Sequence, residues 1–208
     1  MADAEHWNGI YGALKPQQVK YDLWLDPFRD QLMRSAGIPI LDLGCGAGND
    51  TLYLTEHGFS VIACDQSQEA LHRVNELVPG ADTLQIDLLE PLPFASESAQ
   101  VAVADLSLHY FTWADTLRIV SEIRRVLKPS GMLLSRFNST RDVEYGAGLG
   151  KLIEPNYYVW NGKKKRFFES AHLEQLFQQD WAVTLLEEQM LHRYGKPKVV
   201  WVLAAQKL

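Results

Sequence analysis

The sequence of 208 residues predicts an α/β fold in which a doubly wound, mostly parallel sheet carries helices on both faces. Two observations lead to this prediction. Apolar runs of strand length alternate with amphipathic stretches between about residues 40 and 137, and this alternation is typical of parallel sheets. Within it, the segment 40–54, ILDLGCGAGNDTLYL, passes from an apolar run through three glycines into a helical pattern, which indicates strand, tight turn and helix.

The glycine-rich turn predicts a site for a nucleotide-like ligand. Glycine adopts positive φ without strain, and the helix that follows begins with unpaired amides directed at the crevice. Gly44, Gly46 and Gly48 stand in GxGxG register, whereas a dinucleotide fingerprint needs GxGxxG, whose third position is Asn49 here. Asp65 ends the next strand about 20 residues after the first glycine, where a carboxylate can accept hydrogen bonds from ribose hydroxyls.

The other elements are predicted from periodicity and from stop signals. Helices are expected at 22–35, 49–56, 68–78, 113–127 and 170–179, and strands at 60–64, 83–87, 100–105, 132–137, 182–189 and 198–205. Ser67 and Ser170 are placed to cap the helices that follow them. The segment 138–168 is predicted to be long and irregular, as lids and binding loops in compact domains often are.

With these elements in view, the chain resembles the class I S-adenosylmethionine (SAM)-dependent methyltransferases, with a small-molecule, type 11/25-like methyltransferase domain. The resemblance covers residues 38–131 and depends on Asp42 with the GxGxG turn, Asp65, Asp87 after TLQI, ADLSLHYF at 104–111 and VLKPSGMLL at 126–134. It implies a Rossmann-like sheet of seven strands whose last strand is antiparallel, and RYGKPK would form the final hairpin. The ending RYGKPKVVWVLAAQK is also similar to that of the tellurite-resistance-type branch.

The resemblance implies SAM as the cofactor and assigns residues to it. The turn at 44–46 would hold the methionine moiety and Asp65 the ribose diol. Asp87 would take the adenine amino group, beside the amide of Leu88 and the side chain of Gln66. The full predicted set is Asp42, Gly44, Cys45, Gly46, Gly48, Asp65, Gln66, Ser67, Asp87, Leu88, Asp105 and Leu106. Structural readings stay open for three acids: Asp42 may only brace the turn, Asp65 may only cap its strand, and Asp87 may be a plain turn residue.

Catalysis by such a site requires positioning more than covalent help, because the methyl group of a sulfonium is already activated. A base is useful only if the acceptor loses a proton. His109 is the first candidate, since it follows the fourth strand and titrates near neutral pH; the alternative is a histidine packed under the cofactor. Tyr110 and Asp105 are further candidates, and Asp105 could instead hold the methionine amino group through its carbonyl.

Aromatic residues outside the nucleotide core are candidate substrate contacts. Trp7 and Tyr11 would fold over the ligands as a lid, or would anchor the leading helix; Tyr145, Tyr157 and Trp160 lie in the irregular segment. One domain, 1–208, is therefore divided into a lid and helix (1–37), a cofactor-binding core (38–137), a substrate-covering insertion (138–168) and a C-terminal helix and hairpin (169–208). The basic run 163–166 is predicted to be a solvated turn, with recognition of an anionic substrate as the alternative.

The amino-acid composition limits which kinds of binding partner we expect. Hydrophobic residues make up 47% and charged residues 22%, which is an ordinary globular balance, and the net charge of -6 argues against nucleic acid as a partner. Cys45 and Cys64 are too few for a disulfide framework or a structural zinc site, so no metal is expected. With neither a leader nor a membrane-spanning run, we expect a cytoplasmic monomer or homodimer that acts on a small molecule.

A nucleotide crevice of this kind also occurs in proteins with other functions. An NAD-dependent oxidoreductase is disfavoured by the glycine register and by the lack of a YxxxK pair. A catalytically silent SAM-binding module and an aminopropyl transferase on the same fold both remain open alternatives.

Overall fold

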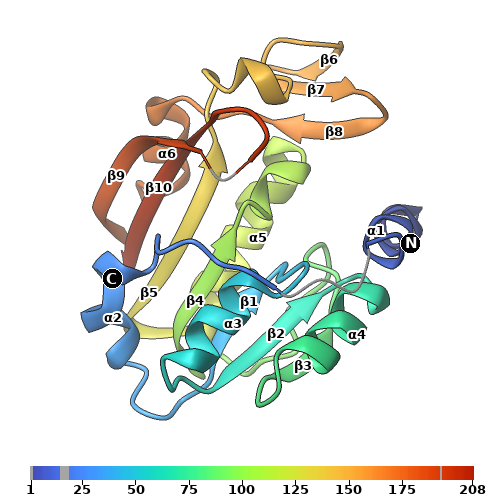
Figure 1. Cartoon of the computed structure of the whole chain (residues 1–208). Helices are drawn as coiled ribbons and strands as arrows, with labels where there is room; N and C mark the ends of the chain where they lie inside the picture. Colours follow the sequence, from blue (N-terminus) through green and yellow to red (C-terminus); the bar gives the residue numbers. More distant parts are fainter. Residues whose placement is uncertain (1, 15–18, 193) are drawn as a thin grey trace.

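A seven-stranded mixed sheet forms the centre of the computed structural model, which describes residues 2–14, 19–192 and 194–208 (Figure 1). The strand order is β3-β2-β1-β4-β5-β10-β9. The strands are β1 (Ile40–Leu43), β2 (Val61–Asp65), β3 (Asp82–Gln85), β4 (Ala99–Asp105), β5 (Leu127–Asn138), β9 (Trp181–Leu191) and β10 (Lys198–Lys207). The first five are parallel, and β10 runs antiparallel to both β5 and β9. The predicted fold class is confirmed.

Helices cover both faces of this sheet. They are α1 (Ala2–Gly12), α2 (Arg29–Met33), α3 (Asn49–Glu56), α4 (Gln68–Leu77), α5 (Trp113–Val126) and α6 (Ser170–Leu176), with 3-10 turns η1 (Asp26–Phe28), η2 (Leu108–Tyr110) and η3 (Val143–Tyr145). One apolar cluster joins Ile119 and Ile123 of α5 to Leu173 of α6 and to the sheet. A second cluster on the other face joins Leu54 of α3 to Leu32 of α2.

Local capping explains where two of the helices begin. The hydroxyl of Ser67 accepts from the amide of Ala70 at 3.2 Å, so the predicted cap of α4 is present. The predicted cap of the last helix is wrong by one residue. Glu169, not Ser170, is the N-cap of α6, and it forms a capping box with His172.

The N-terminal segment differs from its prediction in two ways. A helix over 22–35 was expected, but only η1 and the five-residue α2 form there. Pro27 explains the difference, because proline has no amide hydrogen and cannot continue the hydrogen-bond ladder of a helix that begins at residue 22. In contrast, α1 was not predicted, since its sequence ADAEHWNGIYG lacks an apolar stripe of helical period.

The insertion 138–168 is not irregular as predicted. It contains β6 (Lys151–Glu154), β7 (Tyr157–Trp160) and β8 (Lys163–Arg166), which pair as a separate antiparallel sheet in the order β6-β7-β8. The turn between β7 and β8 is Asn161-Gly162, with φ of +50° and +73°. Positive φ at both central residues is the geometry of a two-residue hairpin, for which Asn-Gly is a strong signal. The basic run therefore forms a strand and not a solvated turn.

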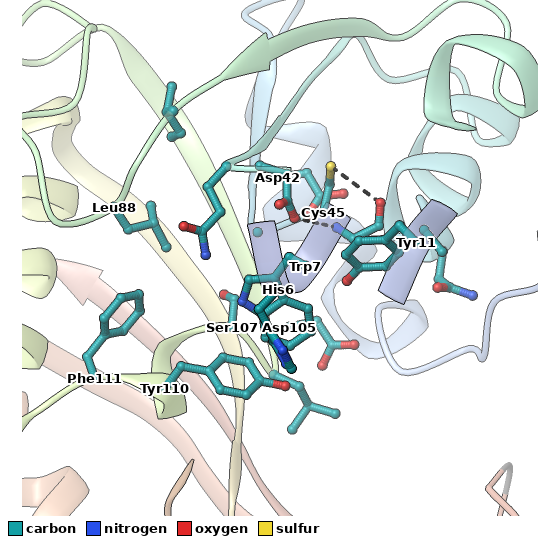
Figure 2. A pocket seen from close by; sticks show the side chains of 18 of the residues that line it. His6, Trp7, Tyr11, Asp42, Cys45, Leu88, Asp105, Ser107, Tyr110 and Phe111 are labelled. Atoms are coloured by element: carbon teal, nitrogen blue, oxygen red, sulfur yellow. Dashed lines mark hydrogen bonds between the residues drawn. The ribbon is translucent and has the colours of Figure 1, made fainter. Parts of the chain in front are cut away.

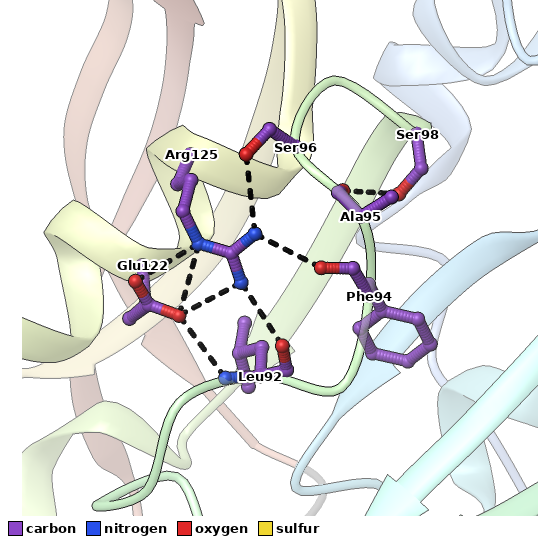
Figure 3. A network of polar contacts seen from close by, with 7 residues as sticks. All are labelled: Leu92, Phe94, Ala95, Ser96, Ser98, Glu122 and Arg125. Atoms are coloured by element: carbon purple, nitrogen blue, oxygen red, sulfur yellow. Dashed lines mark hydrogen bonds and ion pairs between the residues drawn. The ribbon is translucent and has the colours of Figure 1, made fainter.

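The loop between β3 and β4 is held by one arginine of α5 (Figure 3). Arg125 donates to the carbonyls of Leu92 and Phe94, both at 2.9 Å, and pairs with Glu122. The hydrogen bonds from Arg125 keep the pKa of the Glu122 carboxyl below its ordinary value. This network fixes the loop that follows Asp87.

No described helix combines the length and the apolar character needed to cross a bilayer.

Candidate functional site

A cavity of about 440 Å³ lies at the carboxyl ends of β1, β2 and β4, where doubly wound sheets bind their ligands (Figure 2). It is lined by His6, Trp7, Tyr11, Asp42, Gly44, Cys45, Gly46, Ala47, Asn49, Asp50, Asp65, Gln66, Ile86, Asp87, Leu88, Asp105, Leu106, Ser107, Tyr110, Phe111, Gly162, Lys163, Lys164 and Tyr194. Elements from both ends of the chain therefore contribute to a single cavity.

The glycine turn after β1 is the floor of this cavity. Gly44 and Gly46 have φ of +77° and +53°, which glycine adopts without strain. A Cβ atom on Gly44 would lie 2.5 Å from Cβ of Ser107, and one on Gly46 would lie 2.6 Å from the hydroxyl of Tyr11. The turn therefore needs glycine both for its conformation and for the close approach of β4 and α1.

Asp65 connects the glycine turn to the start of α4. Its carboxylate, 8% exposed, accepts from the amide of Gly46 at 2.9 Å and from the amide of Ser67 at 2.8 Å. Burial raises the pKa of Asp65, and these amide hydrogen bonds oppose that rise because they favour the charged form. The side chain is thus fixed in the cavity wall by backbone donors.

Two further acids are buried near the turn. Asp42 accepts from the hydroxyl of Thr51 at 2.6 Å, and Asp50 accepts from the indole of Trp24 at 3.0 Å. Burial, reinforced by neighbouring acids, raises the pKa of Asp42 to about 7 and that of Asp50 well above its ordinary value. Neither acid forms an ion pair among the described residues, so this part of the cavity favours a cationic ligand.

Asp105 at the end of β4 forms an ion pair with a buried arginine. Arg136 of β5 is 0% exposed and contacts both carboxylate oxygens, at 2.6 and 2.7 Å. It also donates to Asp22 at 2.8 Å and lies over the ring of Trp24. Burial alone would lower the pKa of Arg136, but Asp105 and Asp22 raise it above its ordinary value. Because Arg136 contacts both carboxylate oxygens, the pairing favours a positioning role for Asp105 over that of a base.

Aromatic side chains of α1 and η2 line one side of the cavity (Figure 2). Trp7 of α1 meets Tyr110 of η2 edge to face, with ring centroids 4.9 Å apart, and stacks on Tyr11 at 6.0 Å. The helix that carries these rings is docked on α4 through Asn8, whose carbonyl oxygen accepts from the hydroxyl of Ser67 at 2.8 Å. Trp7 and Tyr11 thus both line the cavity, and their role as a lid stays a prediction.

His109 does not line the cavity. It is 3% exposed, its ring lies 4.1 Å from that of Tyr110, and its Nδ1 has no hydrogen-bond partner among the described residues. Burial lowers the pKa of His109 well below its ordinary value, with a further contribution from Lys198 and Lys165. This geometry favours the packing alternative, in which a neutral imidazole supports Tyr110.

The far side of the cavity is formed by the turn of the β7–β8 hairpin and by Tyr194. Gly162, Lys163 and Lys164 line it from the hairpin. Three predicted substrate contacts, Tyr145, Tyr157 and Trp160, lie outside the lining residues. The hydroxyl of Tyr157 instead donates to the carbonyl of Tyr110 at 2.8 Å, so Tyr157 attaches the hairpin to η2.

Most of the predicted cofactor residues meet in one place. The cavity brings together Asp42, Gly44, Cys45, Gly46, Asp65, Gln66, Asp87, Leu88, Asp105 and Leu106. Gly48 and Ser67 lie behind this wall at the starts of α3 and α4. Sequence reasoning missed Arg136 and Tyr194. A charged residue within an apolar strand was a signal for Arg136, whereas nothing local pointed to Tyr194.

Three features together define the class I SAM-dependent methyltransferase fold. They are the strand order, the glycine turn after β1 and the acids at or just after the ends of β2, β3 and β4. Comparison with known proteins gives the family. A family profile described as "Methyltransferase domain" matches residues 41–135. This segment therefore matches the SAM-dependent methyltransferase family, in agreement with the predicted family, and that family implies SAM as the cofactor.

Individual relatives agree with this assignment. An uncharacterized methyltransferase of Synechocystis sp. is 39% identical over 50% of this chain and 48% of its own length. A malonyl-[acyl-carrier protein] O-methyltransferase of Pectobacterium atrosepticum is 31% identical over 47% and 38%. The crystal structure of a SAM-dependent methyltransferase from Methanosarcina mazei has a TM-score of 0.75 at 22% identity, and covers 88% of this chain and 97% of its own. This chain spans about half the length of the first relative, or less for the second.

Proposed function

We propose that the chain transfers the methyl group of SAM to a small-molecule acceptor by in-line displacement. The observation that carries this proposal is the cavity itself, in which acids line the strand ends and aromatic rings and a hairpin lie opposite them. Because one cavity contacts both sets, a cofactor and a small acceptor can meet within it.

The lining residues fit the chemistry of SAM. Asp65 would bind the ribose diol, Asp87 and the amide of Leu88 the adenine, and the turn at 44–46 the amino-acid part. Asp42 and Asp50 are buried and form no ion pair among the described residues, so they suit a ligand that carries a sulfonium and an ammonium group, since each positive charge offsets the cost of burying a carboxylate. Apolar Ile86 and Leu88 would face the flat base.

When bound, SAM supplies an activated methyl carbon, which bonds to the acceptor atom as its bond to sulfur breaks and sulfur keeps the electron pair. The chain has to hold the acceptor in line with that bond and to exclude water. The rings of Trp7, Tyr11 and Tyr110 exclude water from the side of the cavity that α1 and η2 form. Arg136 fixes the carboxylate of Asp105 and thereby the end of β4.

The size of the cavity supports a small acceptor. A volume of about 440 Å³ lies within the usual range for small-molecule sites, and the rings of Trp7 and Tyr110 line one side of it. The net charge of -6 also opposes extended binding to a phosphate backbone.

Two measurements on the purified full chain test this proposal. Calorimetry should show binding of SAM and of its demethylated product, and a screen of oxygen, nitrogen and sulfur acceptors should release that product. Failure to bind SAM would overturn the proposal entirely. Binding without turnover on any small acceptor, combined with methylation of tRNA, would overturn the small-molecule part.

A further inference from the structure

We propose that the acceptor is a small molecule with a carboxylate or phosphate group, and that Lys163 and Lys164 bind this group from the turn of the β7–β8 hairpin. The inference rests on the proposed function and adds the class of the substrate. It concerns the wall of the cavity that the cofactor residues do not form.

The two lysines reach the cavity from a different element than the acids. Asp42, Asp65 and Asp105 belong to strands of the central sheet, Asp87 follows β3 and Asp50 lies in the first turn of α3, whereas both lysines come from β8. Both are exposed, and within the described ranges neither forms a hydrogen bond or an ion pair with a carboxylate. Their charges are therefore available to a ligand.

The cavity thus has an acidic wall and a basic wall. An acceptor anion is repelled by the carboxylates at the strand ends and attracted by the ammonium groups of the hairpin, so the two walls orient it. The reacting end then faces the cofactor side. Tyr110, Phe111 and Tyr194 also line the cavity and would contact the apolar body of the acceptor.

The hairpin is attached firmly enough to serve as a binding wall. Arg166, 4% exposed, pairs with Glu154 of β6 and lies over the ring of Tyr157 with its guanidinium carbon 4.8 Å from the centroid. Glu154 also accepts from the amide of Trp113 at the start of α5, at 3.0 Å. These contacts fix β6–β8 to the core, so the turn is held over the cavity.

Two further lysines, Lys165 and Lys198, lie close to the turn of the β7–β8 hairpin. Lys165, next on β8, has its pKa lowered to about 8 by burial and then by the nearby charges of Lys198 and Lys163. Lys198 is buried and bound to Asp142 at 2.8 Å. Repulsion among these ammonium groups indicates a region that an anion would stabilise.

Matched ligand pairs test the inference. The full chain, saturated with S-adenosylhomocysteine, is titrated by calorimetry with salicylate and salicylamide, 4-hydroxybenzoate and 4-hydroxybenzamide, phenyl phosphate and inorganic phosphate. At least one organic anion should bind about tenfold or more tightly than its neutral partner, as expected for charge-assisted contacts. The comparison of phenyl phosphate with inorganic phosphate shows whether the site binds a phosphate ester or only the free phosphate ion.

The variant Lys163→Gln/Lys164→Gln should weaken that anion about tenfold and leave the amides and SAM unaffected. Lys128→Gln is the matched control, because it removes a positive charge at the opposite end of β5, beyond the cavity. The inference fails if no organic anion binds better than its amide, or if the double variant retains the preference. Both results can occur in a protein that binds SAM normally, whereas loss of SAM binding in the unmodified chain contradicts the proposed function itself.

Discussion

Asp65 is the residue on which the cofactor assignment depends most directly. Its carboxylate already organises the amides of Gly46 and Ser67, so it offers a ribose diol a fixed acceptor. We expect Asp65→Ala to weaken SAM binding about 100-fold or more, in keeping with the loss of charged hydrogen bonds worth about 1.5–3 kcal/mol each. Calorimetry gives the dissociation constant, and circular dichroism checks the fold.

The control for this change is Asp82→Ala, an exposed acid at the start of β3, far from the strand ends that line the cavity. It should bind SAM as the unmodified chain does. An unchanged dissociation constant in Asp65→Ala would show that the ribose lies elsewhere.

Asp42 should make cofactor binding depend on pH. Burial raises its pKa to about 7, so it is mostly protonated below that pH and mostly charged above it. A cationic ligand favours the charged form, so SAM affinity should rise by up to about tenfold between about pH 6 and about pH 8. Asp42→Asn should remove most of this slope, and an equally steep slope in the variant would assign the titration to another group.

Position in the chain explains which residues could be predicted from the sequence. Asp42, Asp65 and Asp87 each follow a recognisable strand, and parallel strands bring their carboxyl ends to one edge. Tyr194 reaches the same cavity from the far end of the chain, and Lys163 reaches it only because an Asn-Gly turn forms a hairpin. Such long-range juxtapositions have no local sequence signal.

At the scale of elements, α1 is the cover of the site, and its attachment to α4 is narrow. Asn8→Ala removes the acceptor for the hydroxyl of Ser67, which should cost about 1 kcal/mol of docking free energy. Limited proteolysis within residues 2–14 should then be about fivefold faster, and added SAM should slow it.

A suitable control is Asn75→Ala on α4, where the side-chain carbonyl oxygen of Asn75 accepts from the hydroxyl of Thr83 at 3.1 Å. It should leave proteolysis of α1 unchanged. Equal rates for Asn8→Ala and the unmodified chain would mean that the aromatic contacts of Trp7 and Tyr11 alone hold the cover.

The elements also differ in how far their sequences predict them. The core strands and α4 are marked by apolar periodicity and a serine cap, so their positions were predicted within a few residues. The strands β6 and β8 lack that pattern. Both are edge strands that pair with β7, and all four residues of β8 are basic. Their form depends on Arg166 and Tyr157, which act through tertiary contacts.

At the scale of the whole molecule, Arg136 connects the N-terminal segment, β4 and β5 in one buried network. Arg136→Met should lower the free energy of unfolding by about 3–5 kcal/mol, since it leaves Asp105 and Asp22 without their buried partner. Urea unfolding measures this loss as a lower midpoint. Arg141→Met, at an exposed pair with Glu188, should change it by less than about 1 kcal/mol.

A comparable loss in both arginine variants would contradict the central place given to Arg136. A large loss in Arg136→Met alone, with SAM binding retained at low temperature, would assign the network to stability more than to the cofactor.

Among the described residues, the three strands β6–β8 pair only with one another, and one isolated bridge, between Ser139 and Phe168, joins the segment after β5 to the segment after β8. The segment can therefore diverge, or be replaced by that of a homologue, without interrupting the ladder of the main sheet. The family profile ends at residue 135, just before this segment. Evolution could thus have altered acceptor choice repeatedly while the nucleotide half was inherited intact, and a chimaera carrying a foreign hairpin is a practical route to altered specificity.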